Sequence, residues 1–405
     1  MACKETRISS GRRLCAWLLA GLLTAALIAP SAAAAQEPAS KQPAADLAAN
    51  AKSAILMDAD SGTVVYEKNS TLSLPPASIT KIMTMLLVME ALDEGRLKLS
   101  DKVTASEHAA SMGGSQIFLE PGEEMTVEDM LKGVALASGN DASVALAEKL
   151  GGSEPQFVAM MNEKAAELGM TNTKFVNCNG LPAEGHMSSA RDIAIMSREL
   201  LKYENITKYT GLYQDYLRKG SPKPFWLVNT NKLVRFYSGA DGLKTGFTSE
   251  AKFCLSATAR RDNLRLIAVV MGEPNTKTRN AEVSQLFDYA FAQYTNVPIY
   301  KKGDSIGTLQ VEKGKVAKVP LTARRSYSVL LKKGDAGKGI RHELVLEPNV
   351  KAPVEIGQPI GKLVVYRGDD VLVEFPVESP EAVERAGWWA LLRRTTGQLF
   401  FSGAD

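Results

Sequence analysis

The sequence predicts an α+β domain, then a small all-β domain and a terminal helix, and three observations support this. Strand-like runs stand at both ends of residues 51–297 with helical segments between them, the pattern of helices packed on a sheet. Short alternating runs separated by Gly, Pro and Lys turns fill residues 298–378, a pattern typical of a β-sandwich. Helical spacing returns in residues 379–405. A chain of 405 residues has room for these parts.

Strands open and close the first domain. Ser53 to Asp58 and Thr63 to Glu67 are β-rich runs around Asp60-Ser61-Gly62, which favours a hairpin. Phe253 to Ala259 and Leu264 to Met271 form a later pair joined by a polar turn. We therefore expect one antiparallel sheet whose first and last strands are far apart in the sequence.

Helical segments occupy the middle of the same domain. Ile79 to Leu92 is apolar on nearly every side, so we expect it to be buried at the centre of a helical cluster. Four other helical patterns and a later amphipathic helix cover residues 126–136, 142–150, 155–168, 190–201 and about 281–294.

The first 35 residues have the pattern of a secretory signal peptide. A basic stretch from Lys4 to Arg13 precedes an apolar core from Leu14 to Ala29 and a small-residue region from Ser31 to Ala35. The apolar core is shorter than the roughly 20 residues that span a bilayer, which disfavours a membrane anchor. We expect cleavage near Gln36 and a flexible lead-in over residues 36–50.

The remaining chain is electrically neutral. The first 35 residues hold four of the 48 basic residues and one of the 45 acidic ones, which leaves 44 of each, so nucleic acid is not an expected partner. Cys3 and Cys15 lie in the signal. We expect Cys178 and Cys254 to be small buried side chains, with a pairing left open. No CxxC or HxxxH spacing suggests a metal, and we expect no cofactor.

The C-terminal tail combines aromatic and basic side chains. Its apolar face over residues 381–401 consists of Trp388, Trp389, Leu391, Leu392, Leu399 and Phe400. Arg385, Arg393 and Arg394 add positive charge nearby. Such a helix is expected to lie in a membrane interface, and the alternative is an ordinary helix packed on its own domain.

Ser78-Ile79-Thr80-Lys81 is an SxxK element. On a helix, this spacing places the hydroxyl and the amine on one face. Serine becomes a good nucleophile only when a base takes its proton, and a lysine can do so if burial lowers its pKa. Pro75 and Pro76 are expected to hold the preceding chain extended, so that a helix begins near Ser78. A second SxxK copy, Ser249 to Lys252, lacks this context.

Two further motifs follow in order. Ser138-Gly139-Asn140 and Lys244-Thr245-Gly246 complete the triple set found in penicillin-recognising serine enzymes. With the surrounding stretches at residues 75–81, 137–142 and 241–248, the chain resembles the low-molecular-mass penicillin-binding proteins, which are serine-type D-alanyl-D-alanine carboxypeptidases. The resemblance implies the transpeptidase fold shared with β-lactamases, a helical cluster on an antiparallel sheet.

The resemblance also implies roles for individual residues. Ser78 would be the acylated nucleophile and Lys81 its general base, while Ser138 and Asn140 would move protons and position the peptide. The implied substrate-binding residues are Lys244, Thr245, Gly246, Phe247 and Arg279. Among them, Lys244 and Thr245 would hold a terminal carboxylate. The backbone N–H groups of Ser78 and Phe247 would form the oxyanion hole.

The activity so implied is removal of the terminal D-Ala from peptidoglycan pentapeptide stems. β-Lactams would acylate the same hydroxyl, and the enzyme would sit at the outer face of the cytoplasmic membrane, attached through its C-terminal helix. The chain departs from some relatives in two places. Asn229-Thr230-Asn231 has no arginine between its asparagines, and Phe247 stands where some relatives have His. Both departures concern rate and substrate preference.

Four alternative functions differ in the support that the sequence gives them. A Ser-His-Asp hydrolase has little support, because only His108, His186 and His342 exist, no GxSxG frames a serine, and His186 is expected to be structural. A β-lactamase of the glutamate-using group would need an ExxxN element, and none lies between Asp141 and Leu243. An idle wall-binding scaffold conflicts with the intact motifs. An endopeptidase of the same mechanism remains open.

Overall fold

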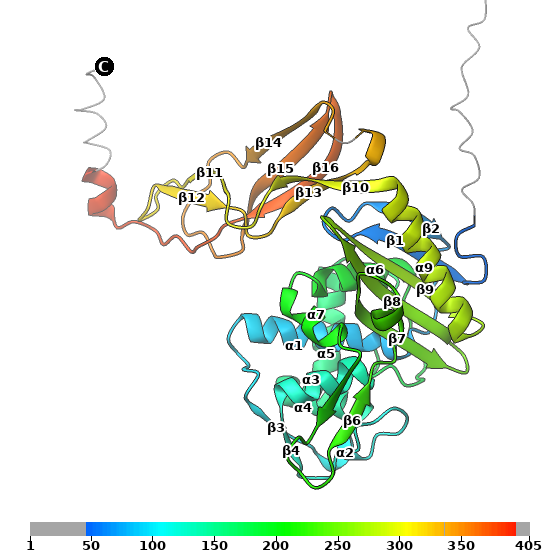
Figure 1. The fold of residues 1–405 in the computed structure, drawn as a ribbon. Coiled ribbons are helices and arrows are strands. Elements are labelled where there is room, and N and C mark those ends of the chain that lie inside the picture. Colours follow the sequence, from blue (N-terminus) through cyan, green and yellow to red (C-terminus); the bar gives the residue numbers. More distant parts are fainter. Residues whose placement is uncertain (1–45, 336, 394–405) are drawn as a thin grey trace, which may run out of the picture. The chain divides into compact units, whose positions relative to one another are not determined.

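A five-stranded antiparallel sheet forms the centre of the first domain in the computed structural model, which describes residues 46–335 and 337–393 (Figure 1). Its strand order is β2-β1-β9-β8-β7. The bounds are β1 Ser53–Asp58, β2 Val64–Lys68, β7 Ala240–Thr248, β8 Lys252–Arg261 and β9 Leu264–Glu273. Because β1 pairs directly with β9, the expectation that the first and last strands share one sheet is confirmed.

Both faces of this sheet are covered, and the two-residue period of a strand sorts its side chains between them. Ile55 and Met57 of β1 belong to a core shared with the helical cluster. Ala54 and Leu56 point into a second core, which they share with Phe287 of the last helix.

The helical elements largely match the predicted segments. Their bounds are η1 Ala77–Thr80, α1 Lys81–Asp93, α2 Glu107–Ala110, α3 Val127–Leu136, α4 Asn140–Gly151, α5 Glu154–Glu167, α6 Ala190–Leu200, η2 Glu204–Ile206, α7 Thr207–Thr210, α8 Leu233–Phe236 and α9 Thr276–Gln293. Residues 81–89 of α1 are all buried, as its apolar composition predicted. Helix α9 begins five residues before the predicted start, because the Asn275 side chain accepts a hydrogen bond from the Thr278 N–H and caps it.

The chain before Ser78 differs from the prediction. Ser78 lies in the 3₁₀ turn η1, and Pro76 has helical angles (φ −80°, ψ −14°) rather than extended ones. A proline favours an extended conformation in the residue before it. The residue after Pro76 is Ala77 and not a proline, so Pro76 itself does not have this bias. The fixed φ of proline itself is compatible with a helical turn.

Two small antiparallel strand pairs of the first domain were not predicted. They pair β3 Lys102–Thr104 with β4 Glu124–Thr126 and β5 Gln214–Leu217 with β6 Phe225–Val228.

The second domain is β-rich and has its own hydrophobic core. Its elements are β10 Tyr294–Tyr300, β11 Ser305–Gln310, β12 Lys318–Thr322, β13 Tyr327–Lys332, η3 Lys333–Asp335, β14 Ile340–Leu346, β15 Pro359–Arg367 and β16 Asp370–Glu378. Sheets pair β10 with β13, β11 with β12, and β14 with β15 and β16. Every alternating run expected here overlaps a strand.

In the described part of the C-terminal tail, residues 388–393 are helical and residues 381–387 are not. The prediction of a helix from Glu381 is wrong for its first turns. Val383 bridges to Val354 and is buried in the β-rich core, so tertiary packing overrides the local helical spacing. Trp388 and Trp389 are 66% and 75% exposed and stack edge to face.

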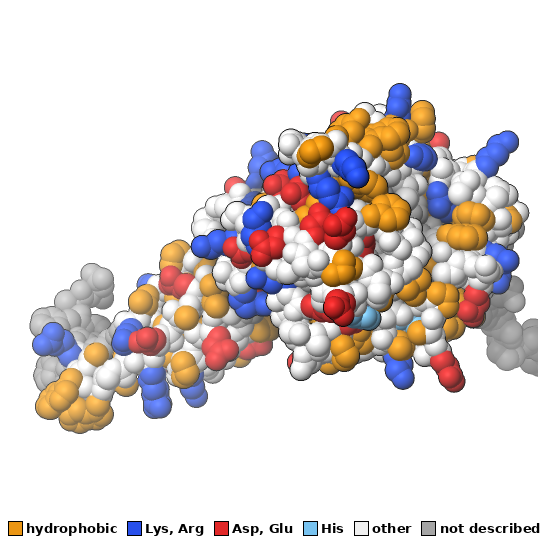
Figure 2. All heavy atoms as spheres, turned by 90° about the horizontal axis from the view of Figure 1, so that it is seen from below, with side chains coloured by type: hydrophobic (Ala, Val, Ile, Leu, Met, Phe, Trp, Pro, Cys, Tyr) orange, Lys and Arg blue, Asp and Glu red, His pale blue; other side chains and the backbone are white. Residues whose placement is uncertain are grey.

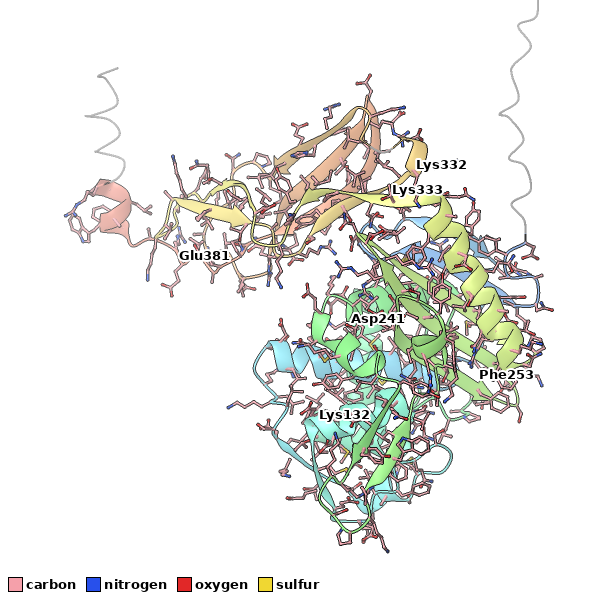
Figure 3. The ribbon with its side chains drawn as sticks, viewed as in Figure 1. Lys132, Asp241, Phe253, Lys332, Lys333 and Glu381 are labelled. Carbon is pink, nitrogen blue, oxygen red and sulfur yellow. The ribbon has the colours of Figure 1, made fainter. Side chains whose placement is uncertain are left out.

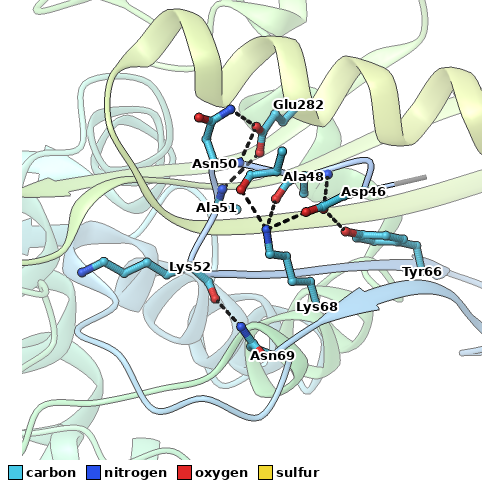
Figure 4. A network of polar contacts seen from close by, with 10 residues as sticks. Asp46, Ala48, Asn50, Ala51, Lys52, Tyr66, Lys68, Asn69 and Glu282 are labelled. Atoms are coloured by element: carbon cyan, nitrogen blue, oxygen red, sulfur yellow. Dashed lines mark hydrogen bonds and ion pairs between the residues drawn. The ribbon is translucent and has the colours of Figure 1, made fainter. Parts of the chain in front are cut away.

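Polar contacts tie down the first described residues, within the segment expected to be a flexible lead-in (Figure 4). The Glu282 carboxylate on α9 accepts hydrogen bonds from the Asn50 N–H at 2.8 Å and from the Ala51 N–H at 3.2 Å. Lys68 on β2 donates to the carbonyl of Ala48 at 2.8 Å and pairs with Asp46 at 3.1 Å. The ordered domain therefore includes residues 46–50.

Two predicted segments, at the two ends of the chain, fall outside the part that the structure describes. The signal peptide with Cys3 and Cys15, and the tail beyond residue 393, lie outside the described residues. Within the described ranges, no helix is long and apolar enough to cross a membrane. On the face shown in Figure 2, acidic and basic side chains are interspersed, in keeping with the neutral composition.

Candidate active site

Ser78 and Lys81 face one another at the start of α1. The Lys81 amine, buried at the first position of the helix, lies 3.0 Å from Ser78 Oγ. Residues three apart align along one edge of a 3₁₀ turn, so η1 gives the SxxK spacing a closer alignment than an α-helix would. Ile79 and Thr80 point into the protein and anchor the turn, while Ser78 stays partly accessible.

Asn140 brings the second motif to the same amine. Its Oδ1 accepts from Lys81 Nζ at 2.6 Å, and its Nδ2 donates to the Gly113 carbonyl at 2.6 Å, which fixes the orientation of the amide. The neighbouring Asp141 accepts from the N–H groups of Ile117 and Leu119 and so holds the facing loop.

Ser138 precedes the start of α4. It is buried, and its φ of +64° is unusual for a residue other than glycine. No hydrogen bond joins Ser138 to Ser78 or Lys81 in the described part of the chain, so only Asn140 of this motif contacts Lys81.

A third acceptor on Lys81 is the backbone carbonyl of Asn179, at 2.6 Å. The sequence did not predict this contact, because every residue has a backbone carbonyl and the residue type therefore gives no signal for it. The Asn177 side chain holds this loop by accepting from the Gly180 N–H at 2.7 Å. A Cβ on Gly180 would lie 1.9 Å from the Ala77 carbonyl oxygen, so only glycine fits there.

Burial shapes the electrostatics of the site. It lowers the pKa of Lys81 to about 7, although Cys178 and Asp141 act in the opposite direction. Burial also lowers the pKa of Lys244 well below its usual value, and the positive charges of Lys81 and Arg279 lower it further. The charges of Lys81 on α1 and Arg279 on α9 therefore both act on Lys244 of β7.

Strand β7 carries the third motif along the free edge of the sheet. Lys244 donates to the Thr245 carbonyl at 3.0 Å, and the Thr245 hydroxyl bonds the Thr230 hydroxyl at 2.8 Å. A Cβ on Gly246 would lie 2.8 Å from the Pro76 carbonyl oxygen, so this glycine lets β7 approach the turn that carries Ser78.

Contacts with β9 and with the adjacent strand β8 support β7. Asp241, labelled in Figure 3, pairs through both carboxylate oxygens with Arg265 of β9 at 2.8 Å. The Phe247 ring is 55% exposed and lies 4.4 Å between centroids from Phe253 of β8.

Arg279 lies in the first turn of α9 and is only 4% exposed. Its guanidinium donates to Asn280 Oδ1 at 3.1 and 3.0 Å. Arg279 is therefore not a solvated residue on the helix surface. Its charge acts on Lys244, which supports a position near the third motif.

The histidines and cysteines play no direct part in this cluster. His186 is buried, and its two ring nitrogens bond Val176 and Thr80, as expected of a structural histidine. His108 pairs with Glu154 and His342 with Tyr300. Both described cysteines, Cys178 and Cys254, are buried and unpaired with each other.

A helical cluster on an antiparallel sheet, with SxxK, SxN and KTG motifs brought together at its edge, defines the class of penicillin-recognising serine enzymes. A family model described as D-alanyl-D-alanine carboxypeptidase matches residues 37–275. A second, described as penicillin-binding protein 5, C-terminal domain, matches residues 294–385.

Individual relatives agree with these matches. The D-alanyl-D-alanine carboxypeptidase DacF of Bacillus subtilis (strain 168) is 54% identical over 386 residues, which is 95% of this chain and 98% of the relative. DacC of Escherichia coli (strain K12), a D-alanyl-D-alanine carboxypeptidase, is 34% identical over 384 residues, 92% of each chain. The crystal structure of penicillin binding protein 5 from Haemophilus influenzae aligns with a TM-score of 0.65 at 32% identity, covering 83% of this chain and 98% of that one.

The chain therefore belongs to the D-alanyl-D-alanine carboxypeptidase family. This confirms the family and the fold class predicted from the sequence.

Proposed function

We propose that this chain is a serine-type carboxypeptidase that removes the terminal D-Ala from peptidoglycan pentapeptide stems through an acyl-enzyme on Ser78. The observation that carries the proposal is the placement of Lys81. Its buried amine contacts the Ser78 hydroxyl and two further acceptors, Asn140 Oδ1 and the Asn179 carbonyl.

Counting donors explains how this lysine acts as a base. A neutral amine has two N–H groups and one lone pair. The Asn179 carbonyl can only accept, and Asn140 turns its oxygen to the amine because its nitrogen is bound to Gly113. Both N–H groups are thereby occupied, and the lone pair faces the Ser78 hydroxyl at 3.0 Å, which is the arrangement a general base needs.

The reaction then proceeds in two stages. Ser78 Oγ gives its proton to Lys81 as it bonds the carbonyl carbon of the terminal peptide bond, and the departing D-Ala amine takes a proton from the protonated Lys81 as the C–N bond breaks. Water next adds to the ester carbonyl, and the Ser78 oxygen regains a proton as the tetrapeptide leaves. Ser138 and Asn140 would assist these proton movements.

Substrate recognition falls to the edge strand β7. Lys244 and Thr245, with Arg279 nearby, would hold the terminal carboxylate by charge-assisted hydrogen bonds. Gly246 keeps the strand close to Ser78. The N–H groups of Ser78 and Phe247 would stabilise the developing oxyanion, and each such donor is typically worth about 3 kcal/mol of barrier.

The location and other ligands follow from the sequence and the family. The signal-like N-terminus and the names of the relatives support export to the outer face of the cytoplasmic membrane. The exposed Trp388 and Trp389 support attachment to a membrane surface through the C-terminal helix. β-Lactams would acylate Ser78 because they present an amide and a carboxylate like those of the substrate.

Intact-mass analysis tests the proposal. Wild-type protein incubated with a penicillin should gain one adduct, and with a pentapeptide it should release D-Ala, whereas Ser78→Ala should do neither. No adduct on the wild type, or an adduct that persists in Ser78→Ala, would refute the assignment. Release of the penicillin adduct within seconds would favour a β-lactamase. Faster cleavage of a cross-linked peptide dimer than of the pentapeptide would favour an endopeptidase.

A further inference from the structure

A chain of buried hydrogen bonds ends at the peptide group just before Ser78. The Val176 N–H donates to His186 Nδ1 at 3.0 Å, and His186 Nε2 lies 2.7 Å from Thr80 Oγ1. The Thr80 hydroxyl in turn donates to the Ala77 carbonyl at 2.8 Å. None of these groups enters the proposed reaction directly.

The direction of the chain follows from its first link. Because His186 Nδ1 accepts from a backbone N–H, the proton of the neutral ring is on Nε2. Nε2 therefore donates to Thr80, whose own proton goes to Ala77. His186 thus determines which way the Thr80 hydroxyl points.

The acceptor at the end of the chain is half of a peptide unit that matters for catalysis. In a planar trans peptide, the C=O and the N–H point in opposite directions. Holding the Ala77 oxygen therefore aims the Ser78 N–H the other way. That N–H is one of the two proposed oxyanion donors.

This peptide needs such support because its local conformation is unfavourable. Ala77 has a φ of +48°, a region that costs a non-glycine residue on the order of 1 kcal/mol or more. Gly180 packs against the Ala77 oxygen, and Gly246 lies near the Ala77 Cβ. These contacts confine the peptide, whereas the Thr80 hydroxyl supplies the directional bond.

We propose that Thr80 and His186 are positioning residues that aim the Ser78 N–H at the oxyanion. The inference rests on the proposed function, because it assumes that Ser78 is acylated. Neither side chain touches the substrate, so their effect should fall on the rate of acylation and not on substrate binding.

Thr80→Val is the informative change, because valine fills nearly the same volume without a hydroxyl. A misaimed donor should lower the acylation rate constant for a penicillin by about 10- to 100-fold, somewhat less than the loss of a whole donor. The dissociation constant of the non-covalent complex should change little. Affinity for a boronic acid, whose tetrahedral adduct places an oxygen in the same hole, should fall in parallel.

Three comparison variants separate positioning from general loss of packing. Thr80→Ser keeps the hydroxyl and should restore most of the rate. His186→Phe keeps the Thr80 hydroxyl, removes the ring nitrogens that orient it and accept from the Val176 N–H, and should give an intermediate loss. Ser53 lies on the distant strand β1, and its buried hydroxyl donates to the Asn69 carbonyl at 2.9 Å. Ser53→Ala removes this hydroxyl and should lower Tm without slowing acylation.

Stopped-flow acylation, with Tm measured for each variant, decides the matter. If the wild type is acylated at Ser78 and Thr80→Val is acylated at the same rate, this inference is overturned and the proposed function still stands. Equal slowing in Thr80→Val and Ser53→Ala would overturn it as well. Absence of acylation in the wild type would instead refute the proposed function. If Thr80→Val does not fold, His186→Phe carries the test, and a wild-type rate there overturns the inference.

Discussion

The pH dependence of acylation follows directly from the environment of Lys81. The catalytic form is the neutral amine, and burial lowers its pKa to about 7. An exposed lysine with a pKa near 10.5 would be neutral in roughly one molecule in 3,000 at pH 7, whereas Lys81 is neutral in about half of them. Burial therefore raises the concentration of active base by about three orders of magnitude.

The expected profile has a defined sign. Below about pH 7 the acylation rate constant should rise about tenfold per pH unit, as Lys81 loses its proton, and it should level off above that pH. Lys244 also has a lowered pKa, and its deprotonation would weaken carboxylate binding. Loss at high pH should therefore appear in the dissociation constant and not in the rate constant.

Stopped-flow acylation with a fluorescent penicillin from pH 5 to 9 separates the two constants. Lys81→Arg is the matched control. Its guanidinium stays protonated, so this variant should not be acylated at any pH in this range. A rate constant independent of pH between 5 and 8, or one that rises only near pH 10, would refute the assignment of Lys81 as the base.

Three further predictions concern stability and local geometry. Between about pH 7 and 10 the unfolded chain binds a proton that folded Lys81 does not, so the free energy of unfolding measured in urea should increase more with pH, or decrease less, in the wild type than in Lys81→Met; equal slopes would contradict this. Gly180→Ala should slow penicillin acylation by at least about tenfold and lower Tm, because its Cβ would meet the Ala77 carbonyl; an unchanged rate would contradict this. Glu282→Gln should weaken the bonds to Asn50 and Ala51, cost about 1 kcal/mol, and speed proteolysis near residue 50 without changing acylation, and equal proteolysis rates would count against that role.

Local spacing predicted much of the site, because its key pair is local. Ser78 and Lys81 are three residues apart, so any helical turn brings them together. The apolar run that follows them predicted the burial that lowers the pKa of Lys81. The order of the three motifs identified Asn140 and Lys244. The contact with the Asn179 carbonyl could not be predicted from the sequence, because it depends on how a loop 98 residues away along the chain folds back on Lys81.

Errors in the predicted fold arose where distant contacts outweigh local preference. Residues 381–387 have helical spacing, yet Val383 is drawn into the β-rich core and bridges Val354. Helix α9 starts earlier than its apolar pattern, because the Asn275 cap is a polar signal. Periodicity reports which face of an element is buried, and it does not report where tertiary contacts end that element.

The position of β1 in the sheet bears on how the enzyme matures. β1 pairs with β2 on one side, but Ser53 pairs on the other side with Met271, so this second partner strand is synthesised about 200 residues later. Pairing between residues so far apart in the sequence favours slow folding. A nascent chain would therefore pass most of its synthesis without a complete sheet, and hydrolytic activity would arise only after β7, β8 and β9 had been made.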